Sequence, residues 1–89
     1  MSTNGSPLTP EAALWWLRSL SVDIRAAAVL DASGAVLAGD ATLAGAAPGR
    51  RLLVARSQRH SIVIRHGRRA LTGLLRNDVQ AALAALEPA

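Results

Sequence analysis

The alternation of apolar and polar positions predicts a helix, a series of strands and a second helix. Residues 1–8 (MSTNGSPL) are small and polar and indicate a flexible tail. Thr9 then suits a helix N-cap, Pro10 the first helical position and Glu11 the positive end of the helix dipole. The helix is expected to run to about residue 20. Its apolar face comprises Ala13, Trp16, Leu17 and Leu20, with Leu14 at the margin.

The next two apolar segments predict a β-hairpin. Residues 24–31 (IRAAAVLD) and 35–38 (AVLA) are the expected strands. Between them, Asp31 can close an Asx turn, and Gly34 tolerates a positive φ. Residues 39–49 (GDATLAGAAPG) are rich in glycine, alanine and proline, so we expect a linker with at most one helical turn.

Three further strands are expected over residues 50–56, 61–66 and 70–75, joined by short turns. A closing helix is expected from Asn77, which can cap it. Its apolar positions are Val79, Ala82, Leu83 and Leu86. Residues 9–89 are therefore predicted to form one α+β domain, a five-stranded antiparallel sheet with both helices on one face.

The last three expected strands are apolar on both sides, whereas a sheet with one face in water alternates apolar with polar residues. Two helices cover one face of such a sheet, and no other element remains for the second. An uncovered apolar face marks an interaction site. The pattern therefore predicts that the chain binds another protein, and a homodimer or higher oligomer is expected.

Charge is unevenly distributed along the 89 residues. Residues 1–48 carry two arginines against four carboxylates, and residues 49–89 carry eight arginines against two. The arginine-rich hairpins of residues 50–69 suit a nucleic-acid backbone, which is the alternative function. Aromatic side chains for base stacking are absent from this segment, so nucleic acid is the less favoured partner.

No set of residues points to catalysis. The chain has no cysteine, and its two histidines, His60 and His66, lie roughly 20 Å apart if they share one strand. They are too far apart to share a metal ion and are expected to face solvent in turns. Each carboxylate fits a helix end, a turn or the linker. We therefore expect no enzyme activity, no metal and no cofactor.

The sequence also bears on location. No apolar stretch approaches the roughly 18–20 residues that span a bilayer, and the first twenty residues lack a signal-peptide pattern. A cytoplasmic protein without membrane insertion is expected.

Two tryptophans are the whole aromatic content. Trp16 falls on the apolar helix face and is expected in the core. Trp15 falls on the polar face, where it either packs under the tail or contacts a partner. The candidate interaction surface comprises Trp15, Leu53, Ile62, Val63, Ile64, Arg65, Arg68 and Arg69.

The segment IRAAAVLDASGAVLAGD resembles the opening hairpin of roadblock (dynein light-chain) family domains, with its D-x-x-G turn at Asp31 and Gly34. RLLVARSQRHSIVIRHGRRALTGLL resembles the three-strand meander that follows, and NDVQAALAAL the closing helix. The likeness implies a roadblock/profilin-like fold, a homodimer, and scaffolding or regulation of a partner such as a small Ras-like GTPase, as in bacteria. The chain departs from the family by lacking a helix between the second and third strands.

Overall fold

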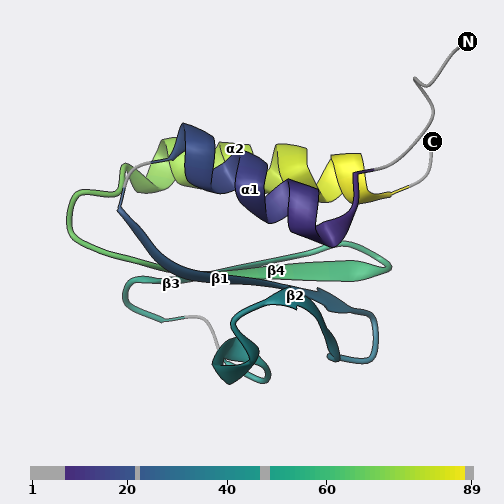
Figure 1. Cartoon of the computed structure of the whole chain (residues 1–89). Coiled ribbons are helices and arrows are strands. Elements are labelled where there is room, and N and C mark those ends of the chain that lie inside the picture. The colour runs from purple at the N-terminus through teal and green to yellow at the C-terminus, as the bar shows by residue number, and fades with distance from the viewer. Residues whose placement is uncertain (1–7, 22, 47–48, 88–89) are drawn as a thin grey trace, which may run out of the picture.

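Two helices lie over one face of an antiparallel sheet, and a short 3-10 helix lies on the other side (Figure 1). The structure, a computed structural model, describes residues 8–21, 23–46 and 49–87. Over these residues the sheet has four strands in the order β2-β1-β4-β3, and all neighbours are antiparallel. The elements are α1 (Pro10–Leu20), β1 (Ile24–Asp31), β2 (Val36–Gly39), η1 (Ala41–Leu43), β3 (Leu52–Arg56), β4 (His60–His66) and α2 (Thr72–Leu86).

The expected fifth strand over residues 70–75 is wrong, because that segment turns and then begins α2 at Thr72. The helical period explains the difference. Leu75 lies four residues before Val79 and continues the buried face of α2, with 2% of its surface exposed. Leu74 beside it is 61% exposed. The cap expected at Asn77 therefore falls inside the helix.

Helix α1 begins as the sequence predicts. The Thr9 hydroxyl accepts a hydrogen bond from the backbone N–H of Ala12 at 3.1 Å, and Pro10 occupies the first turn. The buried face differs at its edges. Leu14 is buried, whereas Leu20, the last residue of the helix, is 53% exposed.

The first hairpin has the turn that its sequence predicts. Asp31 Oδ1 accepts from the backbone N–H of Ser33 at 2.9 Å and of Ala35 at 3.0 Å. Gly34 has a φ of +92°, where a side chain would be strained. The turn chemistry of this segment is confirmed.

The main core lies between the helices and the sheet. Val29, Ile62 and Ile64 point towards the helices and have no exposed surface. Leu53 joins them at 6% exposure. Alternation along β4 then directs Val63 to the opposite face.

The second face of the sheet is not bare, contrary to the expectation from sequence. Leu43 of η1 is 4% exposed and packs against Ala26, Ala28, Leu30 and Val63. Asp40 holds η1 in place, because its Oδ1 accepts from the Thr42 N–H at 2.9 Å. The short linker thus covers much of the surface on which an expected dimer depended.

The flexible tail expected over residues 1–8 lies outside the described residues except for Leu8. The Leu8 N–H donates to the carbonyl of Ala85 at 2.8 Å, which ties the start of α1 to the end of α2.

Candidate anion-binding site

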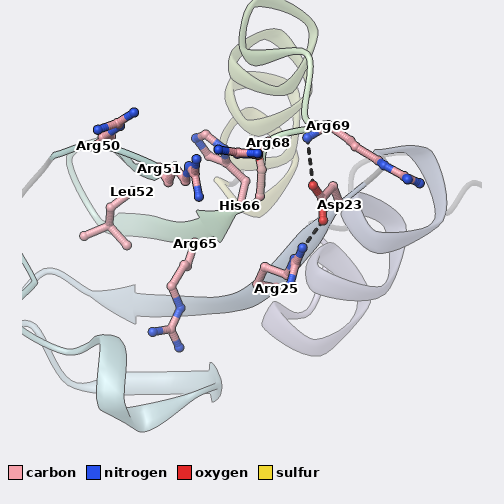
Figure 2. Close-up of a pocket in the computed structure, with 10 residues that line it drawn as sticks. Asp23, Arg25, Arg50, Arg51, Leu52, Arg65, His66, Arg68 and Arg69 are labelled. Atoms are coloured by element: carbon pink, nitrogen blue, oxygen red, sulfur yellow. Dashed lines mark hydrogen bonds and ion pairs between the residues drawn. The ribbon is translucent and has the colours of Figure 1, made fainter.

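Six arginines surround a hollow at the end of the sheet where β1 begins and β4 ends (Figure 2). The hollow has a volume of about 420 Å³, within the range of ligand pockets. We call it the arginine pocket. Its lining residues are Asp23, Arg25, Arg50, Arg51, Leu52, Arg65, His66, Gly67, Arg68 and Arg69.

One wall is a tight turn that carries two arginines at its tip. Gly49 and Leu52 exchange backbone hydrogen bonds of 3.2 and 3.1 Å around Arg50 and Arg51. Arg51 has a φ of +60°, a left-handed conformation that costs a non-glycine residue about 1 kcal/mol or more. The N–H of His66 donates to the Arg51 carbonyl at 2.9 Å and fixes the turn against β4.

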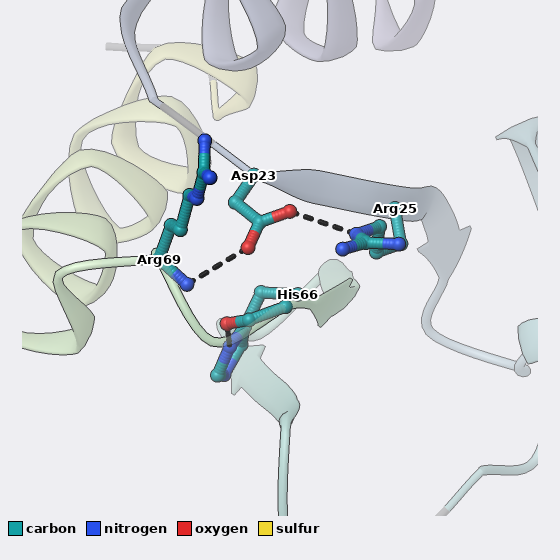
Figure 3. Close-up of polar contacts among 5 residues, drawn as sticks. Asp23, Arg25, His66 and Arg69 are labelled. Atoms are coloured by element: carbon teal, nitrogen blue, oxygen red, sulfur yellow. Dashed lines mark hydrogen bonds and ion pairs between the residues drawn. The ribbon is translucent and has the colours of Figure 1, made fainter.

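Asp23 contributes the pocket's single carboxylate, and that carboxylate already has partners (Figure 3). Its Oδ2 accepts from the backbone N–H of Arg69 at 2.8 Å, and its Oδ1 pairs with Arg25 Nε at 2.7 Å. The Arg69 N–H first, and then the Arg25 side chain, lower the pKa of Asp23 below its usual 3.8. The pocket's positive charge is therefore only slightly compensated.

The six arginines are not equivalent. The Arg69 guanidinium extends to the side of Asp23 away from Arg51 and Arg68, so Arg69 contributes mainly its backbone (Figure 2). Arg65 lies 4.0 Å from Asp40 Oδ2, a long and exposed ion pair that holds it weakly. Arg50, Arg51 and Arg68 lie on the turns and have no ion pair within the described residues.

The two histidines differ from the expectation of solvent-facing turn residues. His66 is 8% exposed, and its Nδ1 lies 3.2 Å from the Gly67 carbonyl. His60 contacts the carboxylate of Glu87 at the far end of β4. Within the described ranges, no group of three or more His, Cys, Asp or Glu side chains could hold a metal ion.

The candidate interaction residues fall in four places. Arg65, Arg68 and Arg69 line the arginine pocket. Trp15 is 71% exposed on α1, outside the pocket. Leu53, Ile62 and Ile64 lie in the core beneath the helices, and Val63 is 3% exposed beneath η1. These four apolar residues are therefore not on the surface of the folded chain.

Arginines that are close in sequence separate in the structure. Arg56 and Arg59 lie at the opposite end of β3 and β4, beside the Ser57–His60 turn. Arg25, from the acidic half of the chain, joins the pocket because Ile24 and Ala26 pair with His66 and Arg65. Sequence reasoning missed Arg25, since only the pairing of β1 with β4 brings it there.

Comparison of the chain with protein-family models, with curated proteins and with solved structures finds no match. The resemblance to the roadblock family stays a prediction. Within the described residues, no helix is long and apolar enough to cross a membrane.

Proposed function

We propose that this protein is a non-catalytic binding module that recognises an acidic segment of a partner protein at the arginine pocket. The observation that carries the proposal is the arginine pocket, where three arginines have no ion pair within the described residues and the lining carboxylate, Asp23, is already bonded. Guanidinium groups pair with carboxylates through short, charge-assisted hydrogen bonds. A small GTPase with an acidic surface, the partner class that the roadblock resemblance implies, is one such partner.

Two features favour a protein over nucleic acid. Among the described residues, no aromatic side chain lines the pocket, so stacking on bases has no support there. Leucine side chains also lie exposed beside the pocket, where a phosphate backbone offers nothing to contact them. Nucleic acid is therefore the less favoured partner, and the binding experiment below includes an oligonucleotide to test it.

Arg51 supplies a clean test, because its backbone conformation favours glycine. Arg51→Gly removes a guanidinium and relieves the left-handed strain, so the variant should be at least as stable as the parent. The double variant Arg50→Gln/Arg51→Gly should lose most of its affinity for a fluorescent deca-glutamate peptide, measured by anisotropy. Binding by the parent should weaken as salt is added.

The matched control is Arg56→Gln/Arg59→Gln, which changes net charge equally at the other end of the sheet. It should leave peptide affinity within about twofold, because charges beyond a Debye length of roughly 10 Å are screened. Equal losses from both pairs would mean unspecific attraction. If single-stranded oligo-dT binds tighter than the peptide and depends on both pairs, the nucleic-acid alternative replaces the proposal.

A further inference from the structure

Three leucines gather on the surface beside the arginine pocket. Leu71 is 63% exposed, Leu74 61% and Leu20 53%. They line a cleft of about 170 Å³ between the end of α1 and the start of α2, comparable to a cavity that holds a benzene ring. We call it the leucine cleft. Its remaining lining residues are Ser21, Leu75 and Asp78.

A hydrogen bond and a core residue form the base and one side of the cleft. The Ser21 hydroxyl donates to Asp78 Oδ2 at 3.1 Å and joins the two helices at this point. Leu75 at the base is 2% exposed and belongs to the core. The exposed leucines therefore lie next to a residue of the main core and to a bond that joins the two helices.

Leu71 is poorly suited to its position in the structure. It is the N-cap of α2, and its side chain makes no capping hydrogen bond. Leucine is among the poorest residues at an N-cap, where serine or aspartate binds the free N–H groups. Because Leu71 contributes neither to the cap nor to the core, its side chain is free to contact another molecule together with Leu20 and Leu74.

The leucine cleft and the arginine pocket are lined by residues that lie close together along the chain. Arg68 precedes Leu71 by three residues, a separation of at most about 10 Å along the chain. Asp23 of the pocket follows Ser21 of the cleft by two residues and bonds the Arg69 N–H. One short partner segment can therefore reach both.

The positive charge of the arginine pocket indicates which kind of molecule binds at this surface. A second copy that bound through this end in a two-fold contact would place the same arginines against one another. A segment with carboxylates beside an apolar side chain complements both features. We infer that the cleft and the pocket form one docking surface for an acidic partner segment whose apolar side chain lies among Leu20, Leu71 and Leu74. This inference rests on the proposed function and names the partner's chemistry.

Selection of a random twelve-residue phage-displayed library on the full chain tests it. The enriched peptides should combine Asp or Glu with a large apolar residue. The best peptide should bind Leu71→Ser and Leu74→Ser about tenfold more weakly or worse by titration calorimetry. Leu71→Ser should unfold at no lower temperature than the parent, because serine suits the N-cap. Leu37→Ser, 40% exposed on β2, is the matched control and should bind normally.

Each other outcome has a definite meaning. Acidic peptides without apolar residues, bound equally by Leu71→Ser, would overturn the inference and leave the proposed function standing. Peptides without acidic residues would overturn both. Leu71-dependent binding to phosphatidylglycerol vesicles in place of peptide would assign the surface to a membrane and reject the inference.

Discussion

Gly67 lies where the Asp23 carboxylate packs against the turn after β4. A Cβ on Gly67 would overlap that carboxylate. The backbone N–H of Gly67 also donates to the Asp23 backbone carbonyl at 2.9 Å. Gly67→Ala should therefore lower the free energy of unfolding by about 1–3 kcal/mol in urea titration. Gly73→Ala is the control, because its Cβ meets open space inside α2, and it should stabilise the protein by up to about 1 kcal/mol. Equal effects of the two changes would contradict this packing.

Asp23 should make the free energy of unfolding depend on pH in the acidic range. Its pKa is lower in the folded chain than the usual 3.8, so the charged form stabilises the fold above that value. The contribution is lost as pH falls through the lowered pKa. Asp23→Asn, which tolerates the same left-handed backbone, should be less stable at pH 7 and lose less on acidification than the parent.

Urea titrations from about pH 6 to pH 2 would measure this difference. Asp31 and Asp40 also have lowered pKa values, caused first by the hydroxyls of Ser33 and Thr42, so part of the acid dependence should persist in Asp23→Asn. Identical pH profiles for the parent and the variant would contradict the role given to Asp23.

At the scale of elements, η1 has only three residues but contributes a buried side chain to the core on the second face of the sheet. Its single buried side chain, Leu43, packs against the second face of the sheet. Leu43→Ala should destabilise the protein by about 2–4 kcal/mol, whereas Leu37→Ala, on exposed β2, should change stability by less than about 0.5 kcal/mol. An unfolding midpoint unchanged by Leu43→Ala would show that η1 does not pack there.

The start of α2 shows how an element can differ from its local pattern. Leu71, Leu74 and Leu75 suit a strand as well as a helix, and Gly73 weakens a helix by about 1 kcal/mol. Packing of Leu75 against the core decides for the helix. Because the segment is helical, Leu71 and Leu74 are exposed, which the expected strand did not indicate.

At the scale of the whole molecule, oligomeric state tests the covered face. The homodimer expected from the sequence rested on a bare second face, and Leu52 and Val54 are only half-buried there. With Leu43 packed on that face, less apolar surface is left for a second copy, so we expect a monomer in sedimentation velocity at about 10 μM. A stable dimer that Val54→Glu dissociates would restore the second face as the interface.

The sequence by itself determined the elements whose signals are local. Thr9 and Pro10 start α1, Asp31 and Gly34 close the first turn, and the apolar runs form β3 and β4. The cap, the first turn and the β3–β4 hairpin depend on hydrogen bonds or sterics between residues close together in the chain, so pattern and propensity suffice for them.

Only the tertiary structure decided the rest. Pairing of β1 with β4 placed Arg25 and Asp23 among distant arginines, and burial of Leu75 extended α2 and exposed the leucine cleft. The same packing put Ile62 and Ile64 beneath the helices and Val63 beneath η1. These outcomes depend on which faces meet, and a sequence period of two or 3.6 residues specifies that side chains share a face but not what covers it.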